Sequence, residues 1–122
     1  MGYPMNSTAV EKYLASLKGA ESSYPFGPDA LVFKVMGKMF ALLAEHEGVP
    51  KVTFKCIPED GAMLVSQFES VIPGYYMSKK HWITISLTGE LPLEMLYDLA
   101  DDSYRLVVNK LTKKDKLLLQ AL

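Results

Sequence analysis

The chain has 122 residues, which is enough for one domain with a sizeable core, and we interpret residues 1–122 as that single domain. Apolar residues make up 49% and charged residues 22%, a globular composition, and no apolar run is long enough for a membrane-spanning helix. The net charge of −1 argues against a protein that coats nucleic acid by overall charge, and a single cysteine excludes an internal disulfide framework.

The first residues do not have the pattern of a secretory signal, which would begin with a basic region followed by an apolar one. A lone cysteine also fits a reducing compartment. We therefore expect a cytoplasmic protein with no membrane association.

The N-terminal part predicts a helix followed by a loop. Thr8 and Glu11 have the spacing of a capping box, and apolar residues then recur at helical intervals until Gly19. Residues 21–29 contain two prolines and a glycine, so we expect a loop there.

The next segment predicts a β-hairpin. Residues 31–35 and 39–45 have the apolar character of strands, and a short turn at 36–38 joins them. Lys34 and Lys38 flank the turn, so the hairpin resembles a wing that lies on a nucleic-acid backbone. The alternative is that both lysines are ordinary solvated side chains.

Residues 49–56 predict a third strand with strict alternation. Apolar side chains occupy positions 52, 54 and 56, whereas Lys51, Thr53 and Lys55 occupy the positions between them. This pattern predicts one buried face and one face exposed to water. Lys51 and Lys55 would then extend the basic surface of the hairpin.

The second half predicts a helix, one or two strands, and two further helices. Pro58 suits the first turn of a helix, residues 70–80 form a long connection with a fourth strand in one interpretation, and residues 81–87 form a strand. The longest helix is expected over 92–111, and Thr112 caps the last one. The order is helix, three strands, helix, one or two strands, two helices. Short turns between sequential strands predict a two-layer α+β domain, an antiparallel sheet with helices on one face.

The stretch 73–82 reads PGYYMSKKHW and is the strongest candidate for a binding segment. It combines Lys79, Lys80 and His81 with Trp82, the one tryptophan of the chain. Cations beside flat aromatic rings suit an anion attached to a ring, such as a nucleotide. The alternative is structural, because a large apolar tryptophan fits a core and lysines keep a sheet edge soluble.

No combination of residues predicts an enzyme. Cys56 lies on the expected buried face, so we interpret it as an inert thiol unless the fold brings it to His46 or His81. Two histidines and one cysteine at no recognisable spacing do not make a zinc site, and the isolated glycines make no phosphate-binding loop. Asp101 and Asp102 are expected on a solvated helix face. We expect a non-enzymatic protein without metal or cofactor.

Four motifs carry a resemblance to a known family. They lie at 24–29 (YPFGPD), 32–43 (VFKVMGKMFALL), 73–82 and 87–92 (LTGELP). In order and spacing they resemble the MmcQ/YjbR family of small bacterial proteins, and the resemblance extends from about Ser7 to Lys114. It implies a double-wing fold that binds DNA.

These observations favour a non-enzymatic DNA-binding domain. Its candidate contacts are Lys38, Lys51, Lys55, Lys79, Lys80, His81 and Trp82. Lysine–phosphate contacts position a protein without reading sequence, and acids of the long helix would cancel them if they shared their face. The alternative is a protein-interaction module that binds a peptide or partner protein through a sheet edge or an apolar groove, where methionines give an adaptable surface. We expect a monomer or a weak homodimer.

Overall fold

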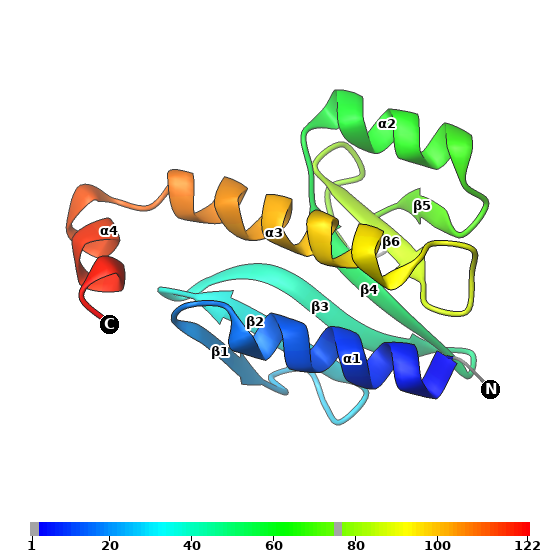
Figure 1. Ribbon diagram of the computed structural model, residues 1–122, viewed down its shortest axis with the longest axis horizontal. Helices are drawn as coiled ribbons and strands as arrows, with labels where there is room; N and C mark the ends of the chain where they lie inside the picture. The colour runs from blue at the N-terminus through cyan, green and yellow to red at the C-terminus, as the bar shows by residue number, and fades with distance from the viewer. Residues whose placement is uncertain (1–2, 75–76) are drawn as a thin grey trace.

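The computed structural model describes residues 3–74 and 77–122, with side chains from Asn6 onward. Its elements are α1 (Tyr3–Ser16), β1 (Ala20–Ser23), β2 (Ala30–Val35), β3 (Lys38–His46), β4 (Val49–Lys55), α2 (Pro58–Gln67), β5 (Val71–Pro73), β6 (Trp82–Ser86), α3 (Leu93–Asn109) and α4 (Lys113–Gln120). In this described part, the strands form one 6-stranded antiparallel sheet in the order β1-β2-β3-β4-β6-β5 (Figure 1). None of the described helices has both the length and the apolar character needed to cross a membrane.

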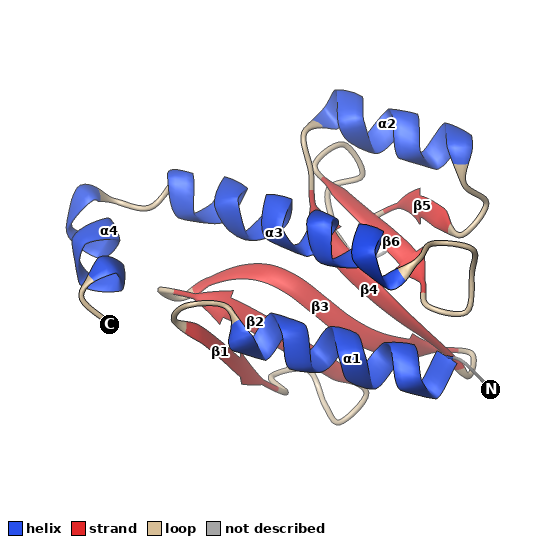
Figure 2. Ribbon diagram, in the orientation of Figure 1, coloured by secondary structure: helices blue, strands red, loops and turns tan. Residues whose placement is uncertain are grey.

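Helices α1 and α3 lie side by side over one face of the sheet, and α2 packs on β5 and β6 (Figure 2). The helices and the sheet share one core, in which Leu14, Phe40, Phe54, Ile85 and Leu96 are almost completely buried. The expected two-layer α+β architecture is therefore confirmed.

The structure corrects the loop expected at 21–29, because β1 occupies its start. This strand pairs with β2, from Ala20 opposite Val35 to Ser23 opposite Val32. Its last three residues are exposed, so it lacks the apolar alternation that predicts a strand. Pairing with β2 at the sheet edge, and not its own side-chain pattern, makes this segment a strand.

Of the two predicted helix caps, the one at α4 is present in the structure and the one at α1 is not. The prediction that Thr8 caps α1 is wrong, because the helix begins at Tyr3. Asn6 instead donates from Nδ2 to the carbonyl oxygen of Leu87 at 3.3 Å, which ties α1 to the end of β6. The cap of α4 is confirmed, since Thr112 Oγ1 accepts from the Asp115 N–H at 3.1 Å.

The alternation in β4 is confirmed only in part. Its apolar side chains are buried beneath the helices, and Lys51 and Lys55 are half-buried on the opposite face. Thr53, between them, is only 4% exposed, and its Oγ1 lies 2.9 Å from that of Thr84. The prediction that this whole face is exposed is wrong for Thr53, because its side chain is buried against that of Thr84, its register partner on β6.

Ser103 joins α3 to the sheet at an irregularity in β3. The register of the β2–β3 pair shifts between Phe33 and Lys34, and Phe40 has no partner in the registers with β2 and β4. Ser103 Oγ donates to the Phe40 carbonyl at 2.6 Å and accepts from the Lys55 N–H at 2.8 Å. Its hydroxyl, which is fully buried, therefore satisfies two backbone groups at the bulge.

Candidate nucleic-acid interface

The basic-aromatic segment forms the connection between β5 and β6. Its two tyrosines, at positions 75 and 76, lie outside the described residues. Lys79, Lys80 and His81 are exposed in the turn that leads into β6, and Trp82 is half-buried as the first residue of that strand. The segment thus presents its cations to water and holds its tryptophan against the sheet.

Two hydrogen bonds and a cation–π contact position Trp82. The Gly74 N–H donates to the Trp82 carbonyl at 2.8 Å, and Lys79 Nζ donates to the Gly74 carbonyl at 3.0 Å. On the neighbouring strand, Lys55 is the register partner of Trp82, and its Nζ lies 5.7 Å from the centroid of the indole ring. The ring attracts an ammonium group at this distance. The structure therefore brings Lys55, Lys79 and Trp82 together.

Lys51 and Lys38 lie farther from this cluster. Lys51 precedes Lys55 by four residues on β4, so the two share a face and are separated by roughly 13 Å along the strand. Lys38 pairs with Val35 beside the β2–β3 turn, and Val35 is buried in the core under the helices. Lys38 therefore belongs to the hairpin tip, on the helix side of the sheet.

A trough of about 680 Å³ lies over β3 on the face opposite the helices. Its apolar lining comes from Phe26, Met39, Leu42, Met77 and Trp82. Asp29 and Glu45 also line it, and the Glu45 N–H donates to the Asp29 carbonyl at 3.3 Å, so these two residues lie at the same end. Its volume is typical of sites that hold small organic groups.

This trough could not be predicted from the sequence, because two separate loops form it. Phe26 lies in the loop that follows β1 and is 77% exposed. The Gly27 N–H donates to the Tyr24 carbonyl at 3.4 Å, which closes a turn with Phe26 near its tip. An aromatic residue inside a loop rich in proline and glycine was the available signal.

The acids of α3 and the lysines of β4 lie on opposite sides of the sheet. Helix α3 packs on β3 and β4 from the helix side (Figure 2), whereas Lys51 and Lys55 extend from the other face. Asp102 pairs with Arg105 within α3, at 3.1 Å between carboxylate oxygen and guanidinium nitrogen. Lys55 and Asp102 nevertheless line one pocket between α2 and α3, so the sheet separates the carboxylates of the long helix from Lys51 more completely than from Lys55.

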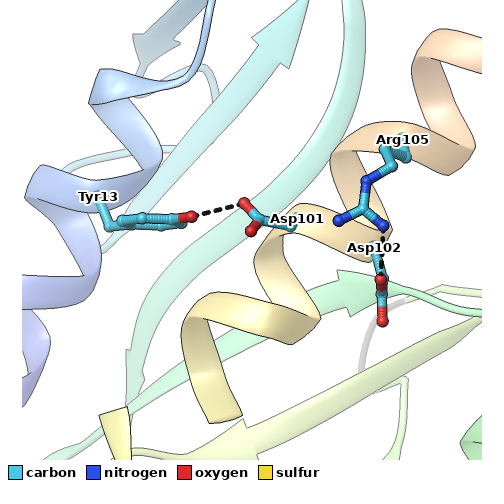
Figure 3. A network of polar contacts seen from close by, with 4 residues as sticks. All are labelled: Tyr13, Asp101, Asp102 and Arg105. Carbon is cyan, nitrogen blue, oxygen red and sulfur yellow. Dashed lines mark hydrogen bonds and ion pairs between the residues drawn. The ribbon is translucent and has the colours of Figure 1, made fainter. Parts of the chain in front are cut away.

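Asp101 is not merely a solvated acid, because it links α3 to α1. Tyr13 donates its hydroxyl to Asp101 at 2.7 Å (Figure 3). Its ring also stacks on that of Tyr97, with the ring centroids 4.3 Å apart. The hydrogen bond to Asp101, then burial and then nearby carboxylate charges raise the pKa of Tyr13 from 10.0 to about 12. The folded protein therefore favours the neutral phenol.

We expect Tyr13→Phe to lower the free energy of unfolding by about 1–2 kcal/mol at neutral pH, because it removes a hydrogen bond to a charged group. The raised pKa means that the stabilisation by Tyr13 is complete below pH 10 and is lost as the pH rises through about 12. Urea unfolding at neutral and alkaline pH should therefore show the difference between wild type and variant shrinking with pH. A difference that stays constant would contradict this assignment.

The fold brings the backbones of Cys56 and His81 together, since the Cys56 N–H donates to the His81 carbonyl at 2.8 Å. The Cys56 side chain is buried under α2, where a Cβ at Gly61 would lie 2.7 Å from Sγ. Burial, and then the charge of Asp60, raises the pKa of the Cys56 thiol, which disfavours the nucleophilic thiolate. Within residues 3–74 and 77–122, no group of histidine, cysteine and acidic side chains could hold a metal ion.

Comparison with protein families gives a match to the family described as YjbR over residues 15–106. The chain belongs to the YjbR family. Two of its relatives are from Escherichia coli. Uncharacterized protein YbdF of strain O157:H7 is 42% identical over 107 residues, covering 88% of each chain. Uncharacterized protein YjbR of strain K12 is 37% identical over 117 residues, covering 95% of this chain and 99% of the relative.

Solved structures share the YjbR fold. Deinococcus radiodurans protein DR2400, with family-model domain DUF419, superposes with a TM-score of 0.82 at 33% identity, covering 93% of this chain and 86% of that one. A crystal structure of a Pseudomonas syringae protein superposes with a TM-score of 0.74 at 26% identity, covering 81% and 96%. The family resemblance found in the sequence is thereby confirmed.

Proposed function

We propose that this YjbR-family protein is a non-enzymatic DNA-binding domain of the cytoplasm. Its interface is the sheet face opposite the helices, centred on Lys55 and Trp82 and extended by the exposed Lys79–His81 turn. The observation that carries the proposal is the cluster at the start of β6, where the Lys55 ammonium group lies 5.7 Å from the centroid of the Trp82 ring beside the exposed Lys79–His81 turn. Lys51 lengthens the basic surface along β4, whereas Lys38 lies at the hairpin tip on the helix side, outside this face.

Phosphate neutralisation explains how a chain of net charge −1 binds DNA. Affinity depends on the lysines that reach phosphates and on the counterions they displace, and not on the total charge. Exposed lysines beside a fixed indole ring place point charges next to an aromatic surface. Such contacts orient the protein on DNA without selecting a sequence.

The test is the salt dependence of binding to a labelled random-sequence duplex, measured by fluorescence anisotropy. We expect the double substitution Lys79→Gln and Lys80→Gln to weaken binding and to reduce the log–log salt slope by about 2 units, since each phosphate contact contributes roughly 0.9 unit. The matched control is Lys113→Gln with Lys114→Gln, which removes the same charge from exposed positions of α4.

Three results would count against this proposal. An unchanged slope in the Lys79 and Lys80 variant would remove these residues from the contact surface. An equal loss in the α4 control would mean that net charge alone governs binding. Absence of binding to any duplex at low salt would refute general DNA binding.

The trough favours one alternative function, a protein-interaction module. Phe26, Met39 and Met77 give this face an apolar and adaptable lining that suits the side chains of an extended peptide. Pull-down from nuclease-treated lysate distinguishes the two functions. A partner that is retained after nuclease treatment, and lost in a Phe26→Ala variant, would favour the peptide-binding module.

A further inference from the structure

We propose that the trough holds unpaired bases, so that this face binds single-stranded nucleic acid in preference to duplex. The inference rests on the proposed function and specifies the form of the nucleic acid. It follows from three features of the same face. These are the aromatic side chains of Trp82 and Phe26, the lysines of β4, and the two acids Asp29 and Glu45 at one end of the trough. Each feature is accounted for by a strand whose bases are accessible.

The aromatic side chains that line the trough favour a flat ligand. Trp82 lines the trough, and the Lys55 ammonium group lies over its ring, which makes the indole a fixed platform. Phe26, the most exposed of the trough's apolar residues, provides a second ring. A duplex keeps the faces of its bases stacked inside the helix, whereas an unpaired strand offers them to aromatic side chains.

The charges give the bound strand an orientation. Lys55 and Lys51 lie along β4, on one side of the trough, and their separation of roughly 13 Å provides positions for two phosphates that are not adjacent in the strand. Asp29 and Glu45 line the trough at the far end of β3 and would repel phosphate. Carboxylates accept hydrogen bonds from the amino groups of cytosine and adenine. The backbone therefore follows β4, and the base beside Lys51, whose register partner Ala44 precedes Glu45, lies over β3 with its edge toward the acids.

The tryptophan provides a direct measurement, because Trp82 is the one tryptophan in the chain. The probe is a labelled strand of about 12 nucleotides, a length within the range of single-strand sites, containing only cytosine and adenine. We expect it to bind about tenfold more tightly than its duplex, since stacking on one aromatic side chain contributes roughly 5- to 150-fold in affinity. Trp82 fluorescence should be quenched with the same midpoint as the anisotropy change.

Two variants test the base contacts. Trp82→Leu should reduce single-strand affinity about tenfold, a larger loss than it causes in duplex affinity. Because Trp82 is half-buried, the exposed Phe26→Ala provides a second test that does not disturb packing, and it should weaken the single strand selectively. Leu117→Ala, at an exposed site on α4, is the control and should change neither affinity.

The outcomes separate this inference from the function on which it rests. Equal affinity for duplex with unchanged Trp82 fluorescence would overturn the inference and leave DNA binding intact. Failure of both probes to bind at low salt would overturn both proposals. If free deoxycytidine monophosphate matched the affinity of the oligonucleotide, the trough would be a nucleotide site, which overturns the assignment to a strand.

Discussion

Ser103→Ala is expected to lower the free energy of unfolding by about 2–4 kcal/mol, because it leaves two buried backbone groups without a partner. The Ser103 hydroxyl donates to the Phe40 carbonyl and accepts from the Lys55 N–H, at 2.6 and 2.8 Å. Both groups lie at the bulge of β3, where the neighbouring strands provide no replacement. This is a large fraction of the roughly 5–15 kcal/mol that stabilises a typical domain.

Urea unfolding followed by circular dichroism measures the effect of Ser103→Ala. The control is Ser66→Ala, since Ser66 Oγ also donates to a backbone carbonyl, that of Met63 at 2.7 Å, but on an exposed helix face. We expect the control to change stability by less than about 0.5 kcal/mol. A loss below about 1 kcal/mol for Ser103→Ala would show that the two backbone groups find another partner.

Gly19→Ala is expected to destabilise the protein by about 2–3 kcal/mol, through backbone strain and a steric clash. Gly19 has φ of +74°, a conformation that is unfavourable for any residue with a Cβ. A Cβ at this position would also lie 2.6 Å from Cδ1 of Leu119, the buried residue of α4. The substitution therefore acts on the docking of α4 as well as on the turn.

Gly37→Ala separates the two contributions to the Gly19 effect. Gly37 has nearly the same φ, +79°, but a Cβ there would meet nothing within 4 Å. It should cost only the strain, about 1–2 kcal/mol, in the same urea measurement. Replacing Leu119 by alanine should remove the difference between the two glycine variants. If the two glycine variants lost equal stability with Leu119 present, α4 would accommodate the added methyl group without a loss of stability.

Local signals in the sequence were sufficient for much of the fold. A turn at 36–38 was predicted between two apolar runs, and its first two residues, Met36 and Gly37, adopt positive φ, as a tight hairpin requires. The cap at Thr112 was also predicted, because it depends on residues three positions apart. By contrast, β1 and the first turn of α1 depend on partners far along the chain, and sequence spacing contains no signal for them.

The candidate site was predicted residue by residue but not as an arrangement. Lys55 and Trp82 were both named from composition and spacing, and only the β4–β6 register makes them neighbours. Lys38 was placed in the same group, yet its register partner Val35 puts it on the helix side. No role was predicted for Ser103, although it interrupts the apolar stripe of α3 and is completely buried.

The sequence by itself determined the two-layer α+β class, the family, the β2–β3 hairpin and the stretch with the densest cations and aromatic rings. These depend on periodicity, turn chemistry and composition, which act over a few residues. Only the tertiary structure decided which face each charge occupies and that Phe26, Met77 and Trp82 enclose one trough. The physical reason is that a sheet sorts side chains by register, and register is set by pairing between distant strands and by the burial of one common core.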